Sequence, residues 1–345
     1  MNEVTLYRKY RPQTFADVVG QDAVVRVLES SIASGKIAHA YLFSGTRGTG
    51  KTSIARIFAR ELGVKPRDLY EIDAASNRGI DEIRELREAV HSLPYESQYK
   101  MYIIDEVHML TTPAFNALLK TLEEPPRHAM FILATTELDD VPETIISRCQ
   151  SFVFKKPSLP DVRTVLEKIA KAEKYEIEPE ALTTLALLGE GSYRDAIGNL
   201  QKVISVAKGK SISSDEVGQV TGAPKLRLVH DIMEKISEKD LAGALELFAG
   251  KEGINAKLLA TLLLEHVRFA MLLAHAPQMK LYVADQVSKD ELEFLEKIGK
   301  KDPGFWPKLL RELLPAFEQF DLAAVPTLPL ELALVRILKE NQSSQ

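Results

Sequence analysis

The strongest constraint on the fold is the sequence GTRGTGKT at residues 45–52, which matches the pattern G-x-x-x-x-G-K-[ST] in full. The apolar run YLFS leads into it, and the helix-like run KTSIARIFARE leads out. Glycines let the backbone curl until several N–H groups face one anion, and the start of a helix adds its dipole. An accidental glycine-rich turn would not need both neighbours. We therefore predict a strand, a phosphate-binding loop and a helix that together hold a nucleotide.

Different residues of this loop are expected to bind different parts of the nucleotide. Lys51 is expected to bridge the β- and γ-phosphates, and Thr52 is expected to ligate Mg²⁺. The predicted nucleotide-binding residues here are Gly45, Thr46, Arg47, Gly48, Thr49, Gly50, Lys51, Thr52 and Ser53.

Two acidic residues end the apolar run MYIIDE, which follows the loop by about fifty residues. Asp105 at the end of a buried strand can hold the magnesium shell, and Glu106 beside it can polarise a water for attack on the γ-phosphate. A strand that ends in solvated acids is the alternative, and it would be preferred if the run stood alone. Paired with an intact phosphate loop, the acids favour catalysis, since binding without hydrolysis would not need Glu106.

Short apolar runs alternate with amphipathic runs through the first half of the chain. Strands are predicted at residues 41–45, 69–73, 101–106, 131–136 and 151–155, where apolar residues show little polar alternation. Helices are predicted between them, one with Asp22 as N-cap and Gly35 as its stop, another with Thr112 as N-cap. Such alternation predicts an α/β fold with a parallel sheet. After Pro157 the strands are expected to stop and helices to continue to the end.

The overall charge excludes a protein held on nucleic acid by a general positive field. The 345 residues carry a formal net charge of −5, so any contact with DNA must be local.

The single cysteine, Cys149, excludes an internal disulfide and a multi-thiolate zinc site. The start MNEVTLYRKYRP lacks an apolar signal region, and charged residues interrupt the apolar run 256–276. We therefore expect a cytoplasmic protein without a membrane span.

Further motifs occur in order along the chain, namely YRKYRPQTFADVVGQ, IDAASNRGIDEIREL, DEVHMLTTPAFNALLKTLEEPP, ILATTE, TIISRC and GSYRDA. With the phosphate loop, they resemble the AAA+ ATPases that load sliding clamps, and among these the gamma/tau family of bacterial DNA polymerase III. The resemblance is dense over residues 4–205 and thinner beyond. It implies an ATP-driven subunit that opens a ring clamp and loads it onto primed DNA, with ATP and Mg²⁺ as cofactors and no polymerase site of its own.

The resemblance also implies the domain organisation. The expected parts are a P-loop AAA+ core with a parallel sheet over residues 1–157, a helical lid over 158–222, and an all-α oligomerisation domain over 223–345.

Roles outside the phosphate loop follow from the same resemblance. The adenine pocket would be lined by Arg11, Pro12, Val18 and Val19. Thr136, with Thr135 as second choice, would sense the γ-phosphate, and Arg194 would be a second sensor that reaches the nucleotide of its own chain. On the residues alone, Arg194 would be a partner of Asp195 or part of a solvated helix start.

The segment TIISRCQSF raises the question whether Arg148 or Cys149 carries function. The resemblance implies that Arg148 reaches into the ATP site of a neighbouring subunit, where a guanidinium stabilises charge on the transferring phosphoryl group. Cys149 is then a small packing residue. The implied catalytic residues are Lys51, Glu106, Thr136, Arg148 and Arg194.

One segment departs from the family. The four-cysteine zinc module that usually follows the phosphate-loop helix is replaced by LGVKPRD at residues 62–68, which contains no cysteine. We therefore expect no zinc. The ATP chemistry is unaffected, but any partner contact made through the module is in doubt.

A DNA contact is predicted at Ser76, Asn77 and Arg78, which precede a predicted helix. Backbone N–H groups and a cation at this point could hold a phosphate. The resemblance to clamp loaders implies that this phosphate belongs to the backbone of the template strand. An ordinary helix cap with a solvated arginine is the alternative.

In the family that the motifs resemble, the region of Leu110, Phe115 and Leu119 docks on the clamp, so the resemblance implies a docking face there. The near-helical spacing of these residues also suits core residues. The other implied partners are the delta and delta-prime subunits and copies of this chain. Rival interpretations are a non-catalytic assembly subunit, an archaeal-type small clamp-loader subunit and a Holliday-junction helicase.

Overall fold

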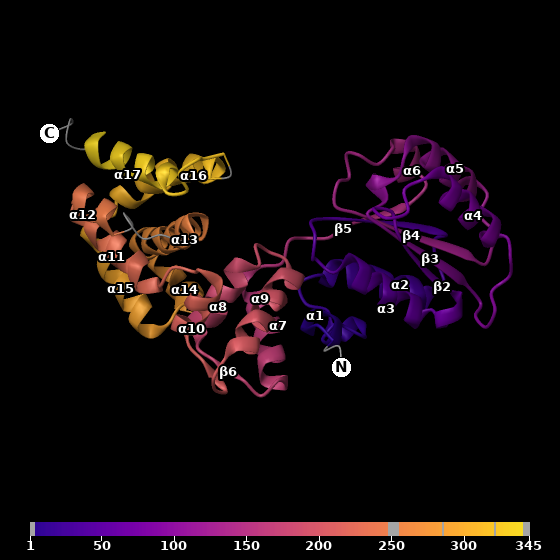
Figure 1. Cartoon of the computed structure of the whole chain (residues 1–345), viewed down its shortest axis with the longest axis horizontal. Helices are drawn as coiled ribbons and strands as arrows, with labels where there is room; N and C mark the ends of the chain where they lie inside the picture. The colour runs from indigo at the N-terminus through magenta and orange to yellow at the C-terminus, as the bar shows by residue number, and fades with distance from the viewer. Residues whose placement is uncertain (1–3, 248–254, 285, 321, 341–345) are drawn as a thin grey trace. The chain divides into compact units, whose positions relative to one another are not determined.

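The computed structural model describes residues 4–247, 255–284, 286–320 and 322–340 (Figure 1). The chain divides into two compact units, the first comprising residues 1–165 and 191–195, the second comprising residues 166–190 and 196–345. This division does not separate a lid from the C-terminal helices. The three domains expected from the sequence therefore remain a prediction.

The first unit is built on a five-stranded parallel sheet, which confirms the predicted α/β class. Its strands are β1 (Ala40–Ser44), β2 (Leu69–Asp73), β3 (Lys100–Asp105), β4 (Ala129–Thr135) and β5 (Gln150–Val153). They lie in the order β2-β3-β4-β1-β5, and all neighbouring pairs are parallel. Because parallel strands end at one edge of the sheet, the residues that follow β1, β3 and β4 meet there.

Helices cover both faces of this sheet (Figure 1). They are α2 (Asp22–Ser34) and α3 (Lys51–Glu61) on one face, and α4 (Ile80–Val90), α5 (Thr112–Glu123) and α6 (Glu143–Ile146) on the other. The short α1 (Leu6–Lys9) precedes them. Successive side chains of a strand point to opposite faces. In β1, Tyr41 and Phe43 join the core formed with α2 and α3, whereas Leu42 joins the core formed with α4 and α5. The central strands β1, β3 and β4 are buried almost throughout, which explains why they lack polar alternation.

Two predicted helix starts are wrong by one residue. Gln21, not Asp22, is the N-cap of α2, and Thr111, not Thr112, is the N-cap of α5. The hydroxyl oxygen of Thr111 accepts a hydrogen bond from the N–H of Ala114 at 3.4 Å. The predicted stop at Gly35 is confirmed, since this residue adopts the left-handed conformation with φ of 65°.

The second unit is mainly helical. Its elements are α8 (Pro179–Leu188), α10 (Ser214–Thr221), α11 (Leu226–Ser237), α12 (Leu241–Glu246), α13 (Ala256–His275), α14 (Lys280–Ala284), α15 (Lys289–Lys301), α16 (Phe305–Gln319), α17 (Leu328–Glu340) and parts of α7 (Leu159–Ala172) and α9 (Tyr193–Val206). Its core encloses the fully buried Trp306. The expectation of no strands after Pro157 is wrong, because β6 (Glu176–Ile177) pairs with β7 (Ser211–Ile212). Strands of two residues are too short to show a periodic signal.

One helix among the described residues, α13, is long and apolar enough to cross a membrane by length and composition. However, 56% of its apolar window is buried inside the protein. This burial agrees with the predicted core helix, because α13 supplies Leu259, Leu263 and Val267 to the core of the second unit.

A buried carboxylate ties the start of β2 to the segment that leads into β3. Asp68 is fully buried and accepts hydrogen bonds from the backbone N–H groups of Tyr95, Glu96 and Ser97 at 2.6, 2.9 and 2.8 Å. Burial alone would raise the pKa of Asp68, but the hydrogen bonds to its charged form outweigh burial and lower that pKa. The ionised carboxylate therefore stabilises the fold.

We predict that Asp68→Asn weakens the first unit at pH 7 by about 1–3 kcal/mol, because an amide cannot accept all three hydrogen bonds. A lowered folded pKa means that the stabilisation is present above the unfolded pKa of about 3.9 and is lost as the pH falls below it. Hydrogen exchange of the β2 and β3 amides measures the effect. The exposed Asp81→Asn is the control, and equal effects of the two variants at pH 7 would contradict the prediction.

Candidate nucleotide site

The phosphate loop is a closely packed turn between β1 and α3, as the sequence predicted. Gly45 has φ of 148°, and a Cβ at this position would lie 2.5 Å from the carbonyl oxygen of Phe154. Gly48 has φ of 76°, and a Cβ there would lie 1.9 Å from Oγ of Ser192. Glycine is required at both positions because other segments approach the loop closely and L side chains rarely adopt these angles.

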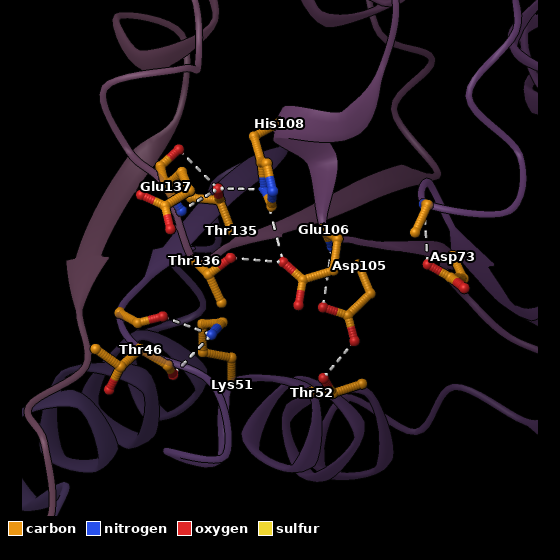
Figure 2. Close-up of polar contacts among 12 residues, drawn as sticks. Thr46, Lys51, Thr52, Asp73, Asp105, Glu106, His108, Thr135, Thr136 and Glu137 are labelled. Atoms are coloured by element: carbon orange, nitrogen blue, oxygen red, sulfur yellow. Dashed lines mark hydrogen bonds and ion pairs between the residues drawn. The ribbon is translucent and has the colours of Figure 1, made fainter. Parts of the chain in front are cut away.

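Lys51 lies inside the curve of the loop. Its side chain is buried, with 6% of the residue exposed, and its ammonium group donates hydrogen bonds to the carbonyl oxygens of Gly45 and Thr46 at 2.6 and 3.0 Å. Burial lowers the pKa of Lys51, while the nearby carboxylates of Glu106 and Asp105 act in the opposite direction. Figure 2 shows the ammonium group of this lysine turned toward Thr46. The loop thus carries a cation whose partners are neutral carbonyls, which suits an anionic ligand.

Thr52 and Asp105 meet across the sheet edge. The hydroxyl of Thr52 donates a hydrogen bond to Oδ2 of Asp105 at 2.7 Å (Figure 2). Mg²⁺ prefers hard oxygen ligands, and a hydroxyl beside a carboxylate supplies them. These two residues therefore fit a magnesium site.

The side chain of Glu106 is hydrogen-bonded to the residue that follows the neighbouring strand β4. Glu106 adopts a left-handed backbone with φ of 51°, and its Oε2 accepts a hydrogen bond from the hydroxyl of Thr136 at 3.0 Å (Figure 2). Thr135, the second choice for the sensor, is fully buried and exchanges hydrogen bonds with the backbone of Glu137. The geometry therefore links Thr136, rather than Thr135, to the carboxylate proposed for catalysis.

His108 is a member of this network that the sequence reasoning missed. Its Nδ1 lies 3.0 Å from Oγ1 of Thr135 and 3.6 Å from Oε2 of Glu106. The hydroxyl proton of Thr135 goes to a carbonyl, so Nδ1 of His108 is the donor toward it. The only available signal was the position of this histidine two residues after Glu106 in DEVH.

The segment that contains Arg194 closes over the loop within the first unit. The N–H of Tyr193 donates to the carbonyl of Gly48 at 3.1 Å, and its hydroxyl donates to the carbonyl of Val19 at 2.9 Å. The guanidinium of Arg194 lies over the ring of Tyr7, 5.8 Å from its centre. Burial and neighbouring cations, Arg194 among them, lower the pKa of Arg11. The predicted adenine pocket and the predicted second sensor are thus neighbours.

Gln21 is a second residue that the sequence reasoning missed. It is 4% exposed, and its amide nitrogen donates to the carbonyl oxygens of Lys155 and Thr49 at 2.7 and 3.4 Å. Its amide oxygen accepts from the N–H of Lys155 at 3.2 Å. This side chain fastens the phosphate loop to the segment after β5. A glutamine in VVGQDAVV carries no local signal for such a contact.

Arg148 pairs with residues of its own chain near α5. Its guanidinium donates to Oε1 of Glu123 at 2.8 Å and to the carbonyl oxygen of Thr144 at 2.8 Å. Its side chain is 35% exposed. Cys149 beside it packs against the apolar core, and burial raises the pKa of its thiol to about 12, so the thiol stays protonated. The prediction of a packing cysteine is confirmed.

The predicted DNA residues lie in an exposed turn between β2 and α4. Asp73 organises this turn by accepting from the hydroxyl of Ser76 at 2.8 Å and, through its carbonyl, from the side chain of Asn77 at 3.0 Å. The carbonyl of Arg78 accepts from the N–H of Thr111 at 3.1 Å. The DNA contact stays a prediction.

The predicted exposure of the clamp-docking residues is wrong for two of them. Leu110 and Phe115 are each 5% exposed and belong to the core under α4 and α5, while Leu119 is partly buried against it. The burial of Leu110 and Phe115 confirms the core alternative for these two residues. Helical spacing could not decide the question, since it is the same for a core face and a docking face.

The parallel sheet, the phosphate loop and the acids at the end of β3 define a fold of the P-loop AAA+ ATPase class. Solved structures of RuvB from Thermotoga maritima share the fold, one of them at a TM-score of 0.53 and 22% identity, covering 73% of this chain and 84% of that one. A second RuvB structure, that of a point variant, covers 86% of this chain and 92% of that one at a TM-score of 0.53 and 19% identity.

The sequence comparisons define the family more narrowly. Residues 20–76 and 65–158 match the profile described as DNA polymerase III, delta subunit, and residues 161–209 match DNA polymerase III clamp loader subunit, ATPase lid domain. The tau subunit of Bacillus subtilis is 40% identical over 317 residues, which cover 84% of this chain and 55% of that protein. The gamma subunit of Buchnera aphidicola subsp. Baizongia pistaciae is 40% identical, with 70% of each chain covered.

This chain belongs to the DNA polymerase III gamma/tau subunit family, as the motifs predicted. It spans only part of the longer relatives, 55% of the Bacillus subtilis protein and 41% of the tau subunit of Escherichia coli, to which it is 43% identical.

We predict that Gln21→Met lowers the free energy of unfolding of the first unit by about 1–3 kcal/mol, because three backbone groups lose their partner. Nucleotide affinity should fall with it, since the loop is no longer fastened. Denaturation and titration with a fluorescent nucleotide measure the two effects. The exposed Gln98→Met should change neither, and an equal loss in that control would rule out the proposed role of Gln21.

Proposed function

We propose that this chain is the ATP-driven motor subunit of a DNA polymerase III clamp loader. ATP binding would favour an assembly that opens a ring clamp, primed DNA would complete the sites, and hydrolysis would release the clamp on DNA. The observation that carries the proposal is the assembled edge of the sheet, where Thr52 bonds to Asp105, Thr136 bonds to Glu106, and Lys51 interacts electrostatically with both acids. Because the chain belongs to the gamma/tau family, we infer that this ATP chemistry serves clamp loading.

The residues of the site have separable roles in this proposal. Lys51 and the N–H groups of the loop bind the phosphates, and Thr52 with Asp105 holds the magnesium shell. Bound Mg²⁺ supplies charge neutralisation at the phosphate oxygens. Glu106 orients and deprotonates the attacking water, and its hydrogen bond to Thr136 couples the base to the residue at the end of β4.

Arg148 is proposed to act in the site of a neighbouring subunit. Its ion pair with Glu123 is partly exposed, with the two side chains 35% and 48% accessible. Exposed ion pairs contribute little to stability, so the guanidinium can exchange this carboxylate for a phosphate at low cost. A guanidinium is suited to the exchange because its planar fork matches carboxylate and phosphate oxygens alike.

The proposed cofactors are ATP and Mg²⁺. The proposed partners are the sliding clamp, primer–template DNA through backbone contacts, the delta and delta-prime subunits and further copies of this chain, in the cytoplasm. A non-catalytic assembly subunit is the main rival. The hydrogen bond of Thr52 to Asp105 and the oriented Glu106 argue against it, since a subunit that only donates an arginine would not need them. The likeness to RuvB concerns the fold alone.

We predict that Glu106→Gln binds ATP with unchanged affinity but hydrolyses it about 100-fold or more slowly, because the general base is lost. Turnover of the complex with primed DNA and clamp measures the rate. Glu137→Gln is the matched control, since this exposed carboxylate contributes only its backbone to the network. Full turnover in Glu106→Gln would refute the catalytic assignment.

We predict that Arg148→Ala retains ATP binding but loses DNA-stimulated turnover by roughly 1,000-fold, the usual effect of removing an arginine finger. The measurement requires every cognate subunit, the clamp and primed DNA. Arg127→Ala, an exposed arginine that follows α5, is the control. Undiminished turnover in Arg148→Ala would end the proposal for this residue.

We predict that Arg78→Ala weakens binding of the assembled complex to primed DNA, since one phosphate contact per subunit is lost. The slope of log K against log salt concentration should become shallower by about one for each altered subunit, because one counterion fewer is released. Affinity measured over a range of salt concentrations gives the slope. Arg84→Ala, an exposed arginine paired with Asp81 on α4, should leave the slope unchanged. Identical slopes for Arg78→Ala and the wild type would exclude the contact.

A further inference from the structure

The second unit gathers two histidines and a glutamate that the ATP chemistry does not use. His230 lies on α11, His266 on α13 and Glu291 on α15. One potential ligand atom from each residue lies within 4.8 Å of the other two. The side chains of His266 and Glu291 are only 4% and 7% exposed. Three helices thus bring donor atoms together inside the helical core.

His266 is oriented as a metal-binding histidine requires. Its Nδ1 lies 2.6 Å from the carbonyl oxygen of Leu262, and a carbonyl only accepts, so Nδ1 carries the proton. The other nitrogen, Nε2, lies 2.5 Å from Oε1 of Glu291. A backbone carbonyl on the far nitrogen fixes the tautomer and the ring orientation, as partners of this kind do around bound metal ions.

His230 presents a nitrogen that no described residue satisfies. Its Nε2 is buried without a hydrogen-bond partner among them, and its ring stacks on Phe294 with the ring centres 4.1 Å apart. A buried polar atom left in this state is costly and calls for an explanation.

We propose that His230, His266 and Glu291 bind a divalent transition-metal ion, for which Zn²⁺ is the best candidate. Two imidazole nitrogens and one carboxylate oxygen form a donor set that zinc accepts, and water completes the tetrahedron. Zinc–ligand bonds of about 2.0–2.2 Å place tetrahedral donors roughly 3.3 Å apart. The His266–Glu291 pair would open slightly to reach that spacing, and the more distant donors would approach.

The alternative is a buried ion pair of His266 and Glu291 without a metal. That arrangement leaves Nε2 of His230 unsatisfied, whereas a shared cation uses all three side chains. The expected absence of zinc rested on the missing cysteines, so it does not extend to this cluster. A bound ion would join α11, α13 and α15 and stabilise the helical core, because binding to the folded state alone favours folding.

The test is titration of the full chain with Zn²⁺ after treatment with a chelator, in nucleotide-free buffer. We expect one ion per wild-type chain and a higher thermal unfolding midpoint with zinc. His230→Phe keeps the stacking on Phe294, and Glu291→Gln keeps the volume. Both should lower the affinity about tenfold or more. His275→Phe, an exposed histidine at the end of α13, should bind like the wild type.

X-ray absorption at the zinc edge of the loaded wild-type chain covers the case in which a variant fails to fold. Two imidazole nitrogens in the coordination shell would support the site. The proposal is overturned by a shell of oxygens only, by the lack of stoichiometric binding, or by equal loss of affinity in His275→Phe and His230→Phe.

Discussion

The hydrogen bond between Thr52 and Asp105 joins the first turn of α3 to the end of β3 across the intervening strand β4. It can form only because the parallel strands end at one edge and because the glycines of the loop let α3 begin there. Lys51 precedes Thr52, and Glu106 follows Asp105, so both are placed by the same geometry. The proposed ATP chemistry therefore depends on the registration of the phosphate loop against the central strands.

The features that the sequence predicted best are those with local signals. The five strands lie within two residues of their expected positions. The central strands β1, β3 and β4 are buried and therefore form continuous apolar runs. The residues of the phosphate loop and the two acids at the end of β3 could be predicted from their spacing and sequence context alone. Two helix caps were predicted one residue too late, because the contacts that the side chains of Gln21 and Thr111 make in three dimensions leave no local signal in the sequence.

Contacts between segments that are distant in the sequence could not be predicted from local sequence patterns. The hydrogen bond between Gln21 and Lys155 joins residues that are 134 positions apart in the sequence. The residues His230, His266 and Glu291 come from three separate helices. The prediction that Leu110 and Phe115 contact the clamp was wrong for a different reason. Helical periodicity reports that a face is apolar, but it does not report whether that face meets the core or a partner.

The central claim is that each ATP site is completed by a guanidinium from another subunit. Mixing Arg148→Ala chains with Glu106→Gln chains, together with the cognate partners, clamp and primed DNA, tests it directly. Each variant alone should be inactive, and mixed assemblies should regain turnover. Recovery requires sites that combine the intact Glu106 of one chain with the intact Arg148 of its neighbour. Mixtures with no turnover above the sum of the separate variants would contradict the account.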